Sequence, residues 1–156
     1  MYNHQPEKYI CPLCQISRGE KTERGGNQEP SVIFRDKSIT VFVAGKWWKS
    51  NLGHVIITSN EHIENIYDMP EKIGHKIFDF SKKVALALKE TYKCDGVSTR
   101  QHNEPAGDQD VWHYHLHIFP RYNGDDLYTN HKGTYWPTEE EKQPYADKLK
   151  SYLSKI

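Results

Sequence analysis

Residues that favour β-strands gather in five short runs along the chain, several with alternating apolar and polar positions. Such runs are typical of strands that bury one or both faces. The first two are separated only by Asp36 and Lys37, a short polar turn that predicts a hairpin. The five predicted strands cover residues 31–35, 38–43, 54–58, 96–102 and 111–119.

A different spacing between the third and fourth strands predicts helices. Asn60 is a candidate N-cap for a short helix through Tyr67, and Pro70 suits the first turn of the next helix. Apolar residues then recur every three or four positions, which predicts one stripe of a helix of about 20 residues. The residues of this stripe are Ile73, Ile77, Phe80, Val84 and Leu88.

Two further segments have weaker signals. Thr138 and Glu141 have the spacing of a capping box, ahead of a shorter amphipathic helix whose start is left open by Pro144. The apolar positions of that helix are Tyr145, Leu149, Tyr152 and Ile156. Residues 18–30 are polar and rich in glycine, so we expect a mobile surface loop with little chemistry.

This order of elements predicts an α+β fold: a five-stranded antiparallel sheet with one long helix and one or two short ones. The 156 residues fit a single domain, 1–156. A sheet with a helix on one side leaves its other face or an edge in need of a partner. We therefore expect a homodimer.

Composition and charge narrow the class of function. The chain has 21 Lys plus Arg and 21 Asp plus Glu, so its formal net charge is zero and no global positive field would hold a nucleic-acid duplex. No stretch approaches the roughly 20 apolar residues that span a bilayer, and the first residues do not resemble a signal peptide. We expect a cytoplasmic protein, without membrane contact, that acts on a small molecule.

The most informative local pattern is three histidines in the last predicted strand. His113, His115 and His117 are two residues apart, so on a strand they share one face. The outer two lie roughly 13 Å apart along the backbone, too far for all three rings to close on one small metal ion. The three histidines must therefore divide their roles. The apolar residues Tyr114, Leu116, Ile118 and Phe119 are expected to face the core.

Histidines in this arrangement suit chemistry at phosphorus. A neutral imidazole is a competent nucleophile at pH 7, and a second imidazole on the same face can donate a hydrogen bond to the leaving group. His115 and His117 match these two roles. Just before them, segment 103–110 combines turn formers and amide side chains that could face a phosphate, and Gln109 is its best candidate.

The order of motifs along the chain resembles that of the histidine-triad (HIT) family, of the bacterial type. The resemblance is carried by His113-X-His115-X-His117 with two apolar residues after it, by Asn51-Leu-Gly-His54 before an apolar run, and by Asn103 and Ala106-Gly107. It covers roughly residues 9–125 and leaves a C-terminal tail or helix over 126–156.

The resemblance implies a nucleotidyl hydrolase or transferase. Members of the family cleave nucleoside phosphoramidates or dinucleoside polyphosphates at the α-phosphorus through a covalent nucleotidyl-histidine. By this likeness His115 attacks, and His117 assists the leaving group and binds phosphate. His54 and Gln109 complete the phosphate pocket, and Asn103 contacts the ribose-phosphate region. The attacking imidazole needs its other nitrogen protonated and held by an acceptor such as a backbone carbonyl.

The chain also departs from the family pattern. Many relatives have an aspartate that binds the ribose hydroxyls, whereas residues 44–50 here contain no carboxylate. The two tryptophans in that segment, Trp47 and Trp48, either line the base pocket or pack at a dimer surface. Asp110 stands where many relatives carry Ser or Thr, so we expect it to point away from phosphate or to bond a histidine.

A second candidate site begins at Cys11 and Cys14, whose spacing offers two thiolates to one metal ion. In zinc-containing relatives the set is completed by a histidine after the Gly-His strand and by the first triad histidine. The resemblance therefore implies His62 and His113 here. Four protein ligands leave no open position, so the zinc would be structural and would tie the N-terminus to the sheet. The alternative is a pair of buried thiols without metal.

The sequence is also compatible with two other functions. His54, His113 and His115 could instead ligate a catalytic zinc that activates water. Alternatively, the chain is a zinc-stapled dimer that binds nucleotide, or acts as a scaffold, without turnover.

Overall fold

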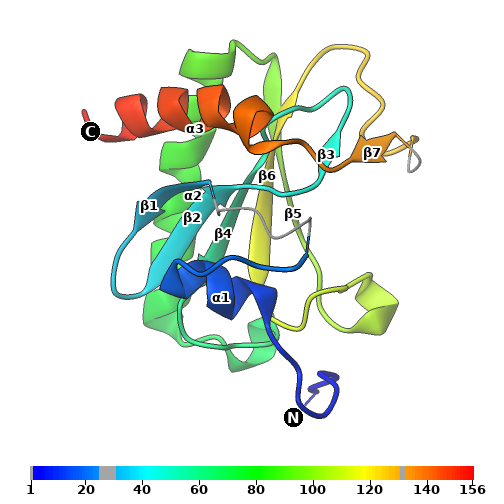
Figure 1. The fold of residues 1–156 in the computed structure, drawn as a ribbon. Coiled ribbons are helices and arrows are strands. Elements are labelled where there is room, and N and C mark those ends of the chain that lie inside the picture. The colour runs from blue at the N-terminus through cyan, green and yellow to red at the C-terminus, as the bar shows by residue number, and fades with distance from the viewer. Residues whose placement is uncertain (1, 25–30, 131–132) are drawn as a thin grey trace.

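A computed structural model describes residues 2–24, 31–130 and 133–156 of the chain (Figure 1). Its main sheet has five strands in the order β1-β2-β4-β6-β5, and every neighbouring pair is antiparallel. The prediction of an α+β fold on a five-stranded antiparallel sheet is confirmed. The strands are β1 (Val32–Arg35), β2 (Ile39–Val43), β4 (Val55–Ser59), β5 (Gly96–Gln101) and β6 (His115–Arg121).

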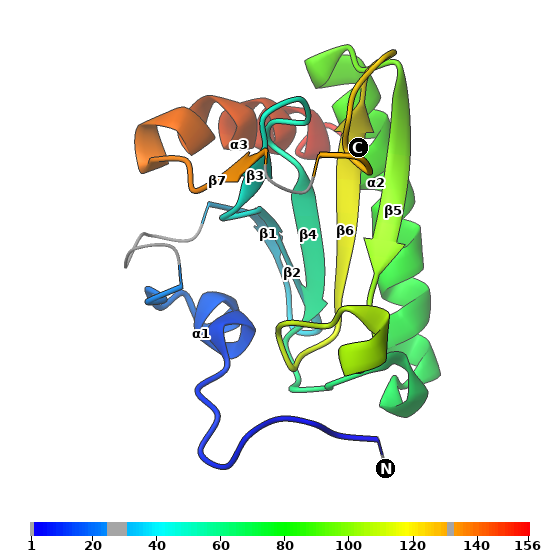
Figure 2. The ribbon, with the colours of Figure 1, turned by 90° about the vertical axis from the view of Figure 1, so that its right-hand side faces the viewer.

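Helices cover both faces of this sheet. The long helix α2 (Glu71–Tyr92) packs on one face and buries most of the predicted stripe, while α1 (Pro12–Arg18) lies on the opposite side of the sheet (Figure 2). The third helix, α3 (Glu139–Leu153), contacts α2 and β1 near one end of the sheet. Because both faces are covered, β2 and β4 are buried along their whole length.

The capping box of α3 is confirmed. The Thr138 hydroxyl accepts a hydrogen bond from the Glu141 amide at 3.2 Å, and the Glu141 carboxylate accepts one from the Thr138 amide at 2.8 Å. Pro144 lies inside the helix, so the cap and not the proline sets where α3 begins.

Two expectations about local structure were wrong, and one helix was missed. The predicted helix over 60–67 is only the 3-10 turn η1 (Ile66–Asp68), because the Asn60 amide bonds Thr40 and the Asp36 carbonyl instead of capping a helix. Helix α1 was not predicted. The last strand begins at His115, four residues later than expected, because residues 111–113 form a bend.

A small second sheet was also not predicted. It pairs β3 (Trp47–Trp48) with β7 (Thr134–Tyr135), two segments far apart in sequence. Trp47 is fully buried against Tyr135 and Tyr145, so it packs in the interior of the chain and neither lines the pocket described below nor faces a dimer surface.

Part of the predicted loop over 18–30 can be compared with the structure. Residues 25–30 lie outside the described residues. Thr22 is buried, and Thr22 and Arg24 line the pocket described below, so this part of the loop is not purely surface. That the loop takes little part in the chemistry stays a prediction. Within the described residues, none of the helices combines the length and apolar character needed to cross a bilayer. The homodimer stays a prediction.

Gly53 is a position where the fold needs glycine. Its φ is +72°, and an added Cβ would lie 2.9 Å from Tyr145 Cγ and 3.0 Å from the Tyr92 hydroxyl. We expect Gly53→Ala to lower the free energy of unfolding by about 2–4 kcal/mol through strain and crowding, measured by urea denaturation. The matched control is Gly74→Ala in α2, where a Cβ meets only Met69 Cγ at 3.5 Å. This control should stabilise by about 0.5–1 kcal/mol. Equal stabilities of the two variants would show that strain and crowding at Gly53 do not require glycine there.

Candidate active site

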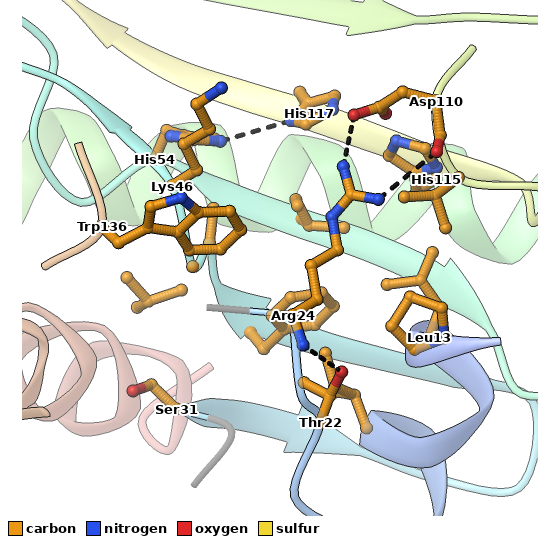
Figure 3. Close-up of a pocket in the computed structure, with 18 of the residues that line it drawn as sticks. Leu13, Thr22, Arg24, Ser31, Lys46, His54, Asp110, His115, His117 and Trp136 are labelled. Atoms are coloured by element: carbon orange, nitrogen blue, oxygen red, sulfur yellow. Dashed lines mark hydrogen bonds and ion pairs between the residues drawn. The ribbon is translucent and has the colours of Figure 1, made fainter. Parts of the chain in front are cut away.

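A cavity of about 560 Å³ opens on the face of the sheet that carries α1 (Figure 3). Its walls come from distant segments: α1, the loop before residue 25, strands β2, β4, β5 and β6, and the start of the C-terminal region. One end is apolar and the other carries imidazoles and a guanidinium. The apolar end includes Leu13, Ile16, Phe42, Val43 and Ile56; the polar end includes His54, Arg100, His115 and His117.

Strand β6 brings His115 and His117 together in this cavity. The two residues alternate with Leu116 and Ile118, so their rings share the pocket face, with centroids 5.0 Å apart. Phe119 was expected to face the core with Ile118, but it follows the alternation of the histidines. Its ring stacks on His54 with centroids 4.3 Å apart, so it forms the floor beneath the imidazoles.

Backbone contact fixes the tautomer of His115. Its Nδ1 lies 2.7 Å from the carbonyl oxygen of His113, and a carbonyl can only accept, so we assign the proton to Nδ1. Nε2 then keeps its lone pair. Burial lowers the pKa of His115, because the charged imidazolium would lose hydration. The side chain is therefore neutral at pH 7, with a nucleophilic nitrogen in the cavity.

A second contact orients His117. Its Nδ1 lies 3.3 Å from Nε2 of His54, and the other nitrogen of His54 is buried without a hydrogen-bond partner. Because a buried unpaired N–H is rarer and more costly than a buried unpaired acceptor, we assign the His54 proton to Nε2. His54 then donates to His117, whose own proton must be on Nε2. Burial lowers the pKa of His54 to about 3 and that of His117 well below its usual value. The pair is neutral, and His117 presents a donor.

His113 does not share the strand with the other two. It lies in the bend before β6, where its Nδ1 is 3.3 Å from Cys11 Sγ and 3.5 Å from Cys14 Sγ. Its other nitrogen lies 2.9 Å from the Ser59 carbonyl oxygen. The expectation of three imidazoles on one strand face is therefore wrong, although the division of roles that the spacing predicted is present.

Cys11, Cys14, His62 and His113 form a compact donor cluster whose ligand atoms all lie within 4.8 Å of one another. The Cys14 Sγ to His62 Nδ1 distance is 3.2 Å. A tetrahedral zinc with ordinary bond lengths places sulfur and nitrogen ligands about 3.6 Å apart. The far nitrogen of His62 lies 2.8 Å from Gln5 Oε1, so both histidines have the outer hydrogen bond typical of zinc ligands. The four residues fit a zinc ion.

The chemistry of the cysteines agrees with this fit. Burial raises the pKa of the Cys14 thiol to about 12, and the neighbouring Cys11 adds to the effect. Without a nearby positive charge, the Cys14 thiol stays protonated at pH 7. A zinc ion supplies the positive charge that holds both as thiolates.

The structure does not bring Asn103 and Gln109 to the cavity. Gln109 is buried, and its amide donates to the Glu64 and Val111 carbonyls and accepts from the Glu104 amide. The Asn103 amide accepts from the Ile66 amide at 2.8 Å and donates to Gln101. Neither residue lines the cavity. Both side chains hold loops in place around it.

Four cationic residues in the cavity were not predicted: Arg24, Lys46, Arg100 and Lys142. Arg24 reaches across from the N-terminal loop and pairs with Asp110 beside His115 (Figure 3). Asp110 therefore bonds an arginine and not a histidine. Arg100 comes from β5 and packs against Trp48. Trp48 lines the cavity, which was one of the two positions expected for it. No local signal in the sequence marks either arginine, because each depends on contacts between distant segments.

The catalytic-zinc alternative required His54, His113 and His115 to converge on one ion. The nitrogens of His113 face the cysteines and Ser59, and Nδ1 of His115 faces the His113 carbonyl. His54 turns to His117. These orientations do not converge, so that interpretation is wrong.

Comparisons with known proteins agree with this geometry. The chain is 28% identical over 129 residues to Protein hit of Bacillus subtilis, covering 82% of this chain and 79% of that protein. Its fold matches the crystal structure of a HIT-like protein from Bartonella henselae, with a TM-score of 0.78 and 22% identity, over 96% of this chain and all of the other.

Two further crystal structures share the fold. A zinc-bound histidine triad family protein from Mycobacterium smegmatis matches with a TM-score of 0.72 and 21% identity, covering 93% of this chain and 94% of the other. A diadenosine triphosphate hydrolase from Plasmodium falciparum matches with a TM-score of 0.69 and 18% identity, covering 99% and 90%. The family model of the HIT domain matches residues 26–124, which include His54 and the three triad histidines. The chain therefore belongs to the HIT domain family.

Proposed function

We propose that this protein is a nucleotidyl hydrolase or transferase that cleaves nucleoside phosphoramidates or dinucleoside polyphosphates at the α-phosphorus. The observation that carries the proposal is the 2.7 Å contact between His115 Nδ1 and the His113 carbonyl, which leaves Nε2 of a neutral imidazole free in the cavity. A nitrogen in this state is a nucleophile toward phosphorus.

The first step forms a bond between His115 Nε2 and the α-phosphorus, and the bond from phosphorus to the leaving group breaks with its electron pair going to the leaving group. A phosphate leaving group departs as an anion, whereas the nitrogen of a phosphoramidate takes up a proton from solvent and departs as an amine. The imidazole ring then carries a phosphoryl group on Nε2 and a proton on Nδ1, so it becomes positively charged. The His113 carbonyl stabilises that charge through the hydrogen bond already present. His117 donates a hydrogen bond from Nε2 to the departing atom or to a phosphoryl oxygen.

The second step regenerates the histidine. In hydrolysis water attacks the phosphorus, the P–N bond breaks, its electron pair returns to His115 Nε2, and one water proton is released to solvent. In transfer another nucleophile takes the place of water. The apolar end of the cavity, at Leu13, Ile16 and Phe42, suits a nucleobase, because it offers flat apolar surfaces to a planar ring.

In this proposal Asn103 and Gln109 position the loops beside the cavity and do not contact phosphate. Cys11, Cys14, His62 and His113 would hold a structural zinc, which supplies charge to two thiolates and anchors the segment before α1. None of the steps above involves it. The diadenosine triphosphate hydrolase that shares the fold supports the proposed reaction class. A homodimer and a cytoplasmic location remain parts of the proposal.

His115→Asn tests the nucleophile. We expect turnover of diadenosine triphosphate and of a lysyl adenosine phosphoramidate to fall about a thousandfold or more, because asparagine has no nucleophilic nitrogen. Intact-mass spectrometry of quenched wild-type protein should show a nucleotidyl adduct that maps to residue 115. The matched control is His75→Asn on the exposed face of α2, which should keep full activity.

Two results would overturn this assignment. Undiminished turnover by His115→Asn would show that another group attacks phosphorus. Binding of adenosine monophosphate without any turnover by the wild type would favour the rival function, a nucleotide-binding protein without catalysis.

Metal content and unfolding test the zinc cluster. We expect one zinc ion per chain by elemental analysis, and Cys14→Ser should lose it and lower the melting temperature by roughly 10 °C, equivalent to about 3 kcal/mol for a chain of this size. Cys94→Ala is the control, because Cys94 is buried away from the cluster and its removal should not change the zinc content. Equal zinc content in wild type and Cys14→Ser would rule out this site.

A further inference from the structure

Arg100 lies beside His117 but outside the family motif. In the antiparallel pairing of β5 with β6, Arg100 is the register partner of His117, so the two side chains leave the same face of the sheet. Arg100 lines the cavity together with His54 and His117. Any phosphate bound at His117 therefore has a guanidinium on the neighbouring strand.

The guanidinium is held in a fixed place by aromatic rings. Its central carbon lies 4.9 Å from the ring centroid of Trp48 and 4.9 Å from that of Phe119. These contacts are cation–π geometry, which orients an arginine without neutralising it. Because Phe119 also stacks under His54, the same ring supports both the imidazole pair and the guanidinium.

The charge of Arg100 has no close counter-ion in the described part of the chain, and Asp108 and Asp110 act on it only through longer-range Coulombic attraction. Among the residues that the structure describes, none forms an ion pair with it, and its Nε is buried without a hydrogen-bond partner. A partly buried cation without a counter-charge is costly unless an anionic ligand completes it. Arg24, the other arginine of the cavity, already pairs with Asp110, and Lys46 is exposed. The remaining cavity cation, Lys142, is buried on α3, which packs against β1 and β2 at the opposite end of the strand order from β5.

The order of strands tells which part of a substrate reaches Arg100. The apolar end of the cavity lies over α1 and β2, the histidines follow on β4 and β6, and Arg100 lies on β5, the next strand outward. Neighbouring strands are about 4.8 Å apart. A nucleoside at the apolar end with its α-phosphorus at His115 directs its leaving group toward β5.

We propose that Arg100 binds the first phosphate of the leaving group, so that this pocket selects substrates with a phosphoanhydride at the α-phosphorus over those that release an amine. This inference rests on the proposed function, because it takes the α-phosphorus to lie at His115. A planar guanidinium that offers paired N–H donors matches the oxygens of such a phosphate. A cationic amine has no lone pair to accept these donors, and a neutral amine has only one and no negative charge.

Equilibrium binding tests Arg100 without turnover. In a His115→Asn background, calorimetry compares adenosine diphosphate with adenosine monophosphate, which differ by the phosphate in question. We expect the diphosphate to bind at least tenfold more tightly. Arg100→Gln should weaken diphosphate binding by about 10- to 100-fold and monophosphate binding by less than about threefold. Arg100→Lys should fall between, because it keeps the charge but loses the planar fork.

Lys46→Gln is the matched control, because Lys46 is a cation at the cavity that comes from a different segment. It should leave the ratio of the two affinities within about threefold of the parent protein. If Lys46→Gln abolishes the preference for diphosphate and Arg100→Gln does not, the leaving group lies toward Lys46 and the inference is wrong. It is also wrong if the parent protein does not prefer diphosphate.

Turnover separates this inference from the proposed function. In otherwise wild-type protein, Arg100→Gln should lower kcat/KM for diadenosine triphosphate about 10- to 100-fold and that for the lysyl phosphoramidate by less than about threefold. Equal losses on both substrates, with thermal unfolding unchanged, would overturn the role of Arg100 and leave the nucleophile intact. If neither substrate is turned over but the binding preference depends on Arg100, the proposed catalysis fails and the phosphate contact stands.

Discussion

The carbonyl group of His113 is the contact on which the arrangement of the site depends. Its oxygen takes the Nδ1 proton of His115 at 2.7 Å, while the imidazole of the same residue faces the two cysteines and donates to Ser59. One residue therefore connects the donor cluster to the proposed nucleophile. Any rotation of the bend that carries His113 would remove the acceptor that keeps the lone pair of His115 on Nε2. Because Cys11 and Cys14 contact the His113 ring, the donor cluster also supports the tautomer proposed for catalysis.

Burial makes this tautomer useful. His54, His115 and His117 lie close together in a cavity where the sheet, Phe119 and the covering segments remove water, and the lost hydration lowers the pKa of each imidazole. Two of these neutral rings form a chain of hydrogen bonds, in which His54 donates to His117 and His117 presents a donor to a ligand. Protonated rings at these distances would repel one another, and none would offer a lone pair to phosphorus.

Periodicity and motif order predicted the sheet, the long helix and the two histidine clusters, because those features depend on nearby residues or on a strongly patterned motif. Contacts between distant segments explain most of what could not be predicted. Asn60 bonds a neighbouring strand instead of capping a helix, and Gln109 turns to buried carbonyls. The register that sets Arg100 opposite His117 is likewise invisible in a single strand, because a shift of one residue would turn the side chain to the other face.

The contacts of Arg100 differ from those of the three arginines that pair with carboxylates. Arg18 pairs with Glu20, Arg24 with Asp110 and Arg121 with Asp125, and in the last pair the guanidinium holds the pKa of the carboxyl far below its usual range. Arg100 is set instead between two aromatic rings, which fix its position, and it forms no ion pair with any of the described residues. A carboxylate paired with this guanidinium would work against the proposed anion site, because it would repel the phosphate that we propose the neighbouring imidazoles bind.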